Sequence, residues 1–200
     1  MQSSANPCPI ASIPGLYISD ITVPSSPVQL QDHGITHVLT LLSTPKRPQI
    51  PPSLNITHKI IEIDDDALAD LLGVLEEACT FIASALTLPA TKGETVEKDD
   101  TRESRVLVHC LQGLSRSGAI IVAYTMKFLS LSYTSALALA RKHRAVIAPN
   151  AGFAEQLHLW ERMEYSVWEE GGEDERKEKD LYKEWTVSYT HLTLPTTPYV

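Results

Sequence analysis

The segment that most constrains the fold is residues 105–131, where a strand pattern changes to a helix pattern across a short polar loop. The run RVLVH at 105–109 is apolar and rich in valine, which predicts a buried strand. Cys110 follows it directly, and the loop LQGLSR leads into an apolar stretch that predicts a helix over 115–131. The sequence therefore places a thiol at the end of a strand and Arg116 at the start of a helix.

The loop between Cys110 and this helix has the features of an anion-binding site. The first N–H groups of a helix have no partner within it, and together with the helix dipole they attract an anion. Gly113 permits the turn and a close approach of backbone to ligand. Arg116 carries a planar guanidinium that can grip two oxygens of a tetrahedral anion. Because a thiolate is also an anion, the same cradle favours the reactive form of Cys110, so we expect a phosphate pocket with a nucleophile at its floor.

The composition of the loop argues against two other kinds of site. A metal site would require further Cys or His residues close to Cys110, and only His109 is present. A nucleotide-binding loop of the Walker type would require Gly-Lys-Ser/Thr, and the loop contains no lysine. We therefore expect no metal and no cofactor.

Short strands and helices alternate along the chain, which indicates an α/β domain. Strands are predicted from short apolar runs, and helices from apolar residues that recur at helical spacing. We expect strands at residues 13–18, 36–42, 57–63 and 105–109. We expect helices at residues 27–33, 70–88, 115–131, 133–144 and 152–167.

Three stretches are expected to lie outside this framework. Residues 1–12 are a lead rich in proline and small residues, and we predict that they are flexible. Residues 89–104 are polar, charged and aperiodic, which predicts a flexible surface loop. Residues 166–200 begin with a charge run and are expected to form a disordered tail. The last of them, SYTHLTLPTTPYV, match no preceding element, so no function is assigned to them.

Composition limits the partners and the compartment. The net charge of −8 argues against a nucleic-acid partner, which would require a basic face. No apolar run reaches membrane-spanning length, so no membrane partner is expected, and the first residues lack the pattern of a secretion signal. Three cysteines, Cys8, Cys79 and Cys110, suggest reduced thiols in the cytoplasm, the nucleus or both. Cys79 lies on the apolar face of its predicted helix, which indicates core packing. The sequence does not predict the oligomeric state.

The loop also carries a family resemblance. HCLQGLSRSG fits the H-C-x5-R-S/T signature of the cysteine-dependent protein tyrosine phosphatases, and its form resembles the small, atypical members of the dual-specificity branch. RAVIAPNAGFAEQL at 144–157 and IPGLYIS near the N-terminus are similar to further segments of that branch. The resemblance covers roughly residues 13–162. It implies a catalytic domain over 13–165, with a central mixed sheet of about five strands flanked by helices.

The resemblance also implies roles for the residues of the loop. Cys110 would attack phosphorus to form a phosphocysteine, and Arg116 would hold the phosphoryl oxygens. Ser117 would assist departure of the sulfur, and His109 would brace the loop and favour the thiolate. The phosphate-binding loop would comprise Leu111, Gln112, Gly113, Leu114, Ser115 and Arg116. No metal or cofactor takes part in this mechanism.

The family places its general acid just after a strand and before the long helix that precedes the cysteine loop. The sequence IEIDDDALADLL occupies this place. An ungapped count assigns the acid to Asp65, whereas a shift by one residue would assign it to Asp64 or Asp66. Asn150 matches a family asparagine that is expected to act as a structural brace near the pocket.

The predicted function is hydrolysis of phosphotyrosine and phosphoserine or phosphothreonine in a phosphorylated protein substrate. The first alternative is the same mechanism on a non-protein substrate, which could be a phosphoinositide, a phosphoglucan or an RNA 5′-phosphate, because a fold does not determine its substrate. The second is a module that binds phosphoproteins without turnover. Such modules typically lose the cysteine or the arginine, and this chain has both.

Overall fold

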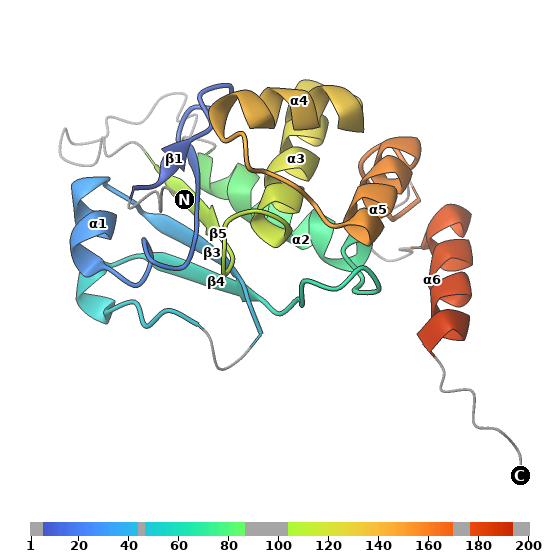
Figure 1. Cartoon of the computed structure of the whole chain (residues 1–200), viewed down its shortest axis with the longest axis horizontal. Helices are drawn as coiled ribbons and strands as arrows, with labels where there is room; N and C mark the ends of the chain where they lie inside the picture. Colours follow the sequence, from blue (N-terminus) through green and yellow to red (C-terminus); the bar gives the residue numbers. More distant parts are fainter. Residues whose placement is uncertain (1–5, 44–46, 87–103, 170–176, 194–200) are drawn as a thin grey trace, which may run out of the picture.

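A five-stranded mixed sheet lies at the centre of the protein, as the computed structural model of residues 6–43, 47–86, 104–169 and 177–193 shows (Figure 1). The strand order is β1-β2-β5-β3-β4, and β2, β5, β3 and β4 run parallel while β1 pairs antiparallel with β2. The strands are β1 (Cys8–Pro9), β2 (Leu16–Ser19), β3 (His37–Leu41), β4 (Thr57–Ile61) and β5 (Val106–His109). The mixed sheet predicted from the sequence is confirmed.

The helices are α1 (Pro27–Asp32), α2 (Leu72–Leu86), α3 (Arg116–Leu129), α4 (Tyr133–His143), α5 (Ala151–Arg162) and α6 (Asp180–Thr193), with a short 3-10 helix, η1, at Pro52–Leu54. Helices α1 to α5 lie at positions close to the predicted ones, and a further helix, α6, was not predicted. Helix α3 ends before Ser130, whose φ of 52° is left-handed. Helix α5 ends five residues earlier than predicted, because Glu164 and Tyr165 also have positive φ.

The two faces of the sheet are covered by helices of different number and size. Val106 and Val108 of β5 belong to a large apolar core that includes residues of α2, α3 and α5. Leu107 points the other way, into a small cluster that includes Leu30 of α1. Helix α3 is buried throughout Arg116–Met126, so it is the central helix of the large core. The strand and the helix that flank Cys110 are therefore both held in the interior.

The prediction of a flexible N-terminal lead is wrong for its second half. Cys8 and Pro9 form strand β1 on the edge of the sheet, in register with Ile18 and Tyr17. Ile10 is fully buried in the large core, and the Cys8 thiol donates a hydrogen bond to the carbonyl of His143. The edge of β2 supplies backbone partners that the proline content of the lead did not suggest.

The prediction of a disordered C-terminal tail is wrong for residues 177–193. An isolated bridge pairs Trp168 with Glu178, and helix α6 follows. Tyr182 on α6 is buried against the large core and hydrogen-bonds to Asp70, so an aromatic anchor outweighs the local charge. The rest of the predicted tail, at 170–176 and 194–200, lies outside the described residues, as does the predicted loop at 89–103.

Within the described ranges, no single helix has the length and apolar character needed to cross a membrane. Helices α3 and α4 meet these criteria only as a pair bent by 117°, and α3 is an interior helix of the core.

Candidate active site

Strand β5 and helix α3 place Cys110 at the carboxyl end of the parallel strands. Cys110 is 1% exposed and follows the last residue of β5. The loop after it turns at Gly113, whose φ of 70° is left-handed. A Cβ atom at Gly113 would lie 2.6 Å from the carbonyl oxygen of Ser19, so only glycine fits between the loop and β2. The loop that we predicted from sequence is therefore wrapped closely around the thiol.

Two hydrogen-bonding groups reach the sulfur of Cys110. The backbone N–H of Gly113 donates to Sγ over 3.2 Å, and the hydroxyl of Ser117 lies 3.2 Å from the same atom. Ser117 is itself fully buried in the first turn of α3. Both contacts can stabilise negative charge on sulfur, because each group can present a proton to it.

The remaining loop amides are available to an anion. The backbone N–H groups of Leu111, Gln112, Leu114 and Ser115 form no hydrogen bond with another described residue. They immediately precede α3, whose positive dipole end faces the same loop. The loop thus combines unused donors with a favourable dipole beside a buried thiol.

Arg116 begins α3 and is 8% exposed. Its Nη1 donates to the carbonyl of Ile63 over 3.3 Å, and its Nε lies 3.8 Å from Oδ2 of Asp65. Its buried Nε makes no hydrogen bond within the described part of the chain. The guanidinium is therefore fixed in place and retains a donor for a ligand.

The three consecutive aspartates have different partners. Oδ1 of Asp65 accepts hydrogen bonds from the hydroxyl of Ser115 over 2.6 Å and from Nδ2 of Asn150 over 3.0 Å. Asp64 instead accepts from Ser43, and Asp66 accepts from the backbone of Leu68. Asp65 is the one of the three whose contacts lie on the cysteine loop and its support, which agrees with the ungapped count.

The segment between α4 and α5 holds the loop from outside. Nε of Arg144 donates to the carbonyl of Gly113, and the backbone N–H of Ala148 donates to the carbonyl of Leu114. The backbone N–H of Asn150 donates to the hydroxyl oxygen of Ser115. These contacts attach the segment between α4 and α5 to the cysteine loop at three of its residues, Gly113, Leu114 and Ser115.

His109 takes part in a chain of hydrogen bonds behind the thiol. Its Nδ1 donates to the carbonyl of Cys110 over 3.3 Å, and its Nε2 lies 2.6 Å from the hydroxyl of Thr40. Burial lowers the pKa of His109 to about 4, so the ring is neutral at pH 7 and Nε2 accepts the Thr40 proton. The Thr40 oxygen, 2.7 Å from Nε2 of His58, then accepts from that ring.

The sequence predictions did not include Thr40 and His58. Thr40 is the one buried polar residue of β3, where it lies between Leu39 and Leu41, and this exception is the signal that could have identified it. Its partners are 18 and 69 positions away in the chain, which no local pattern shows.

Comparison with known proteins identifies the family. A family model described as the catalytic domain of dual specificity phosphatases matches residues 16–163. The chain belongs to the dual specificity phosphatase family. It is 36% identical over 149 residues to dual specificity protein phosphatase MPK-4 of Drosophila melanogaster, over 74% of this chain and 35% of that protein. It is 32% identical over 151 residues to dual specificity protein phosphatase 26 of Bos taurus, over 74% of this chain and 65% of that protein. The chain thus spans less than two thirds of the length of these two relatives.

Solved structures support the same family. Human DUSP28 matches with a TM-score of 0.64 at 27% identity, over 78% of this chain and 93% of that one. The human tyrosine phosphatase-like serine/threonine/tyrosine-interacting protein matches with a TM-score of 0.65 at 26% identity, over 80% and 97%. The phosphatase fold expected from the resemblance is confirmed.

In the described part of the chain, the two cysteines outside the loop, Cys8 and Cys79, lack the hydrogen-bond donors that surround Cys110. Burial in the large core raises the pKa of Cys79 to about 12, which keeps that thiol protonated and inert. Burial also raises the pKa of Cys8, with a smaller opposing effect from the charge of Arg144. All three cysteines are free. No cluster of three or more His, Cys, Asp or Glu side chains suited to a metal ion occurs among the described residues.

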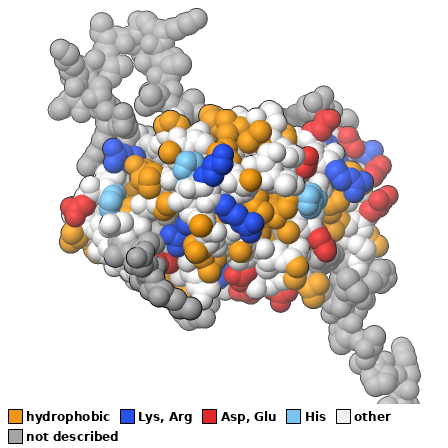
Figure 2. Space-filling view, turned by 45° about the horizontal axis from the view of Figure 1, so that its top comes forward, with side chains coloured by type: hydrophobic (Ala, Val, Ile, Leu, Met, Phe, Trp, Pro, Cys, Tyr) orange, Lys and Arg blue, Asp and Glu red, His pale blue; other side chains and the backbone are white. Residues whose placement is uncertain are grey.

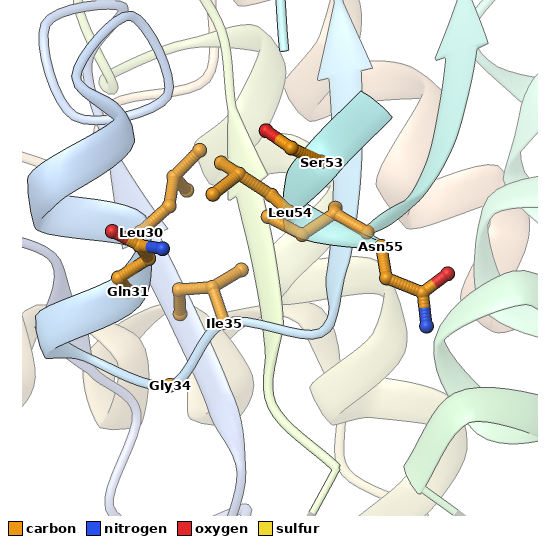
Figure 3. Close-up of a pocket in the computed structure, with 8 residues that line it drawn as sticks. Leu30, Gln31, Gly34, Ile35, Ser53, Leu54 and Asn55 are labelled. Carbon is orange, nitrogen blue, oxygen red and sulfur yellow. The ribbon is translucent and has the colours of Figure 1, made fainter. Parts of the chain in front are cut away.

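A pocket of about 240 Å³ lies elsewhere, between the end of α1 and η1 (Figure 3). Its residues lead into β3 and β4, so it lies at the opposite end of the parallel strands from Cys110. It carries no charged side chain and no cysteine; its lining is Leu30, Gln31, Gly34, Ile35, Ser53, Leu54, Asn55 and Ile56. We therefore assign it no part in the phosphatase site.

Proposed function

We propose that this chain is a protein phosphatase that hydrolyses phosphotyrosine and phosphoserine or phosphothreonine through a phosphocysteine intermediate. The observation that carries this proposal is the set of contacts around one sulfur atom. The N–H of Gly113 and the hydroxyl of Ser117 both reach Cys110, and Arg116 and Asp65 lie beside the same loop.

In the first step, the Cys110 thiolate attacks phosphorus, and the bond from phosphorus to the substrate oxygen breaks. Arg116 and the loop amides hold the phosphoryl oxygens and stabilise their charge in the transition state. Asp65 gives its proton to the departing oxygen, which leaves as an alcohol or phenol. The contact between Asp65 and Ser115 supports this role, because it places the carboxyl group at the edge of the loop.

In the second step, water attacks the phosphocysteine. Asp65, now a carboxylate, takes a proton from the water, and the bond between phosphorus and sulfur breaks. Inorganic phosphate and the thiolate are the products. The Ser117 hydroxyl donates a hydrogen bond to the departing sulfur, which its 3.2 Å separation from Sγ supports.

His109 and Asn150 are proposed to brace this machinery. A neutral His109 donates to the Cys110 carbonyl, so it fixes the orientation of the residue without adding charge. Asn150, the residue before α5, donates from Nδ2 to the carboxyl group of Asp65 and accepts from the backbone N–H of Phe153 in the first turn of α5.

A phosphorylated protein is the substrate class that the relatives favour, because MPK-4 and phosphatase 26 are named as dual specificity protein phosphatases. The surface of this chain is compatible with an anionic substrate despite the net charge of −8. Figure 2 shows Lys and Arg side chains near the middle of one face, with most Asp and Glu side chains toward its edges. We propose neither a nucleic-acid nor a membrane partner. Three free thiols support residence in the cytoplasm, the nucleus or both.

The first test of the proposal is turnover of p-nitrophenyl phosphate in EDTA by the wild type and by Cys110→Ser. We expect metal-independent turnover by the wild type, inhibition by vanadate, and loss of activity in the variant by at least about 1,000-fold, because a hydroxyl is a far weaker nucleophile here. Cys79→Ser is the matched control and should stay active. Turnover that survives in Cys110→Ser would refute the mechanism.

Substrate class requires a separate comparison. Peptides that carry phosphotyrosine or phosphothreonine are assayed beside a phosphoinositide and an RNA 5′-phosphate. We expect release of phosphate from both peptides. Release from only one peptide would contradict dual specificity, and a preference for a non-protein substrate would replace the proposed substrate class.

A further inference from the structure

Helix α5 and the residue before it contact the segment that carries Asp65 at three successive points. At the start of the helix, Asn150 donates to the carboxyl group of Asp65. In the first turn, Gly152 lies so close to Ala67 that an added Cβ atom would come within 1.9 Å of the Ala67 carbonyl oxygen. One turn further, Gln156 reaches the residues that lead into α2. The helix thus contacts the segment along its length from Asp65 to the start of α2.

Gln156 is fully buried, and its amide uses both ends on this segment. Its Oε1 accepts hydrogen bonds from the backbone N–H of Leu71 over 2.7 Å and of Leu72 over 3.1 Å. Its Nε2 donates to the carbonyl of Ala69 over 2.9 Å. A buried amide with all of these partners on one segment fixes that segment relative to α5, because each lost partner would leave a buried polar group unsatisfied.

We propose that Gln156 is a positioning residue for the general acid. It holds residues 65–72 against α5 so that Asp65 lies beside the cysteine loop before the substrate arrives. This inference rests on the proposed function of Asp65 as the acid. A purely structural role, in which Gln156 only caps α2, predicts lower stability without any preference among substrates.

The leaving group distinguishes the two roles. p-Nitrophenolate leaves readily without a proton, whereas phenolate is a poorer leaving group and depends on the acid. A misplaced Asp65 therefore slows the cleavage of phenyl phosphate more than that of p-nitrophenyl phosphate. The ratio of the two kcat/KM values measures this difference in cleavage rate, because kcat/KM includes only the steps up to formation of the phosphocysteine.

The test measures kcat/KM for both substrates in the wild type and in Gln156→Met, which keeps the volume and removes the amide. We expect kcat/KM for phenyl phosphate to fall about 10- to 100-fold and that for p-nitrophenyl phosphate to fall no more than about 3-fold. In an Asp65→Asn background, Gln156→Met should change the ratio no further, because the acid has already been removed.

Thr125→Val is the matched control. Thr125 is also fully buried on a helix, and its hydroxyl donates to the carbonyl of Ile121 within α3. This variant should leave the ratio of the two substrates unchanged. Vanadate binding by Gln156→Met should also be retained, because the phosphate loop itself is untouched.

Two results would overturn the inference while the proposed function stands. The first is an equal loss of kcat/KM on both substrates in Gln156→Met. The second is a change in the ratio when Gln156→Met is added to Asp65→Asn. A wild type that hydrolyses neither substrate would overturn the proposed function and the inference with it. If Gln156→Met does not fold, Gln156→Glu replaces it and is assayed where the new carboxyl is ionised, since this variant keeps an acceptor for Leu71 and Leu72, loses the donor to Ala69 and places a negative charge beside the Ala69 carbonyl. The same direction of change in the ratio is expected, and an unchanged ratio would overturn the inference.

Discussion

Behind Cys110, three buried or half-buried polar side chains form a directed series of hydrogen bonds. Because His109 donates from Nδ1 to a carbonyl, its Nε2 must accept from Thr40, and Thr40 must accept from His58. Protonation of His109 would reverse the contact with Thr40 and place a charge in the core. Burial lowers the pKa of His109 to about 4 and His58 lowers it slightly further, whereas the hydrogen bond to the Cys110 carbonyl and, to a smaller extent, the charge of Asp20 oppose this shift.

This lowered pKa predicts a dependence of stability on pH. Below pH 6.5 the unfolded chain binds a proton at His109 and the folded chain does not, so the free energy of unfolding falls as the pH drops from 6.5 toward 4. The loss from His109 is at most about 3 kcal/mol. Urea unfolding from pH 7 to 4.5 should show a steeper loss for the wild type than for His109→Gln. Parallel pH profiles for the two proteins would contradict the assignment.

At the scale of elements, helix α6 packs against the large core through Leu181, Tyr182 and Trp185, and Tyr182 adds a hydrogen bond to the catalytic domain. The Tyr182 hydroxyl donates to Oδ2 of Asp70 over 2.7 Å, and the other oxygen of Asp70 accepts from the backbone of Gly73 near the start of α2. Burial and the neighbouring Asp70 carboxylate raise the pKa of Tyr182. The Tyr182 ring also stacks on Trp185. Asp70 therefore links α6 to the same segment that carries the proposed acid.

Tyr182→Phe should loosen α6 and leave the core intact. The variant loses a hydrogen bond to a carboxylate, which contributes about 1 kcal/mol at this partly exposed site. We expect faster hydrogen exchange in α6 and unchanged exchange in α3. Tyr165→Phe is the matched control, because the Tyr165 hydroxyl donates to the Leu131 carbonyl and has no contact with Asp70. Unchanged exchange in α6 of Tyr182→Phe would show that the hydrogen bond does not hold the helix.

At the scale of the whole molecule, the parts predicted from sequence are those with local signals. The strand–loop–helix around Cys110 and the helices of the large core follow from apolar periodicity and a short motif. Helix α6 was missed because its anchor depends on a distant partner; Tyr182 and Asp70 are 112 positions apart. Strand β1 was missed because the prolines of the lead gave no sign that it would pair with the edge of β2. Gln156 was missed for the same reason, since its partner Leu71 is 85 positions away.

The candidate site also has parts with a local sequence signal and parts that depend on distant partners. The motif allowed Cys110 and Arg116 to be proposed as reactive groups, and counting limited the proposed general acid to Asp64, Asp65 or Asp66. The contacts that separate Asp65 from Asp64 and Asp66 come from Ser115 and Asn150, which only the folded chain brings together. The sequence therefore indicates which residue types the site contains, and the folded structure indicates which of them lie together.

The most direct test of the central claim is to trap the covalent intermediate. Asp65→Asn is mixed with p-nitrophenyl phosphate and quenched rapidly, and its peptides are analysed by mass spectrometry. This variant still forms the phosphocysteine from a good leaving group but lacks the base that activates water, so phosphate should accumulate on Cys110. We expect phosphate on the Cys110 peptide of Asp65→Asn and none on the corresponding peptide of Cys110→Ser. Turnover by the wild type with phosphate on another residue, or on none, would contradict it.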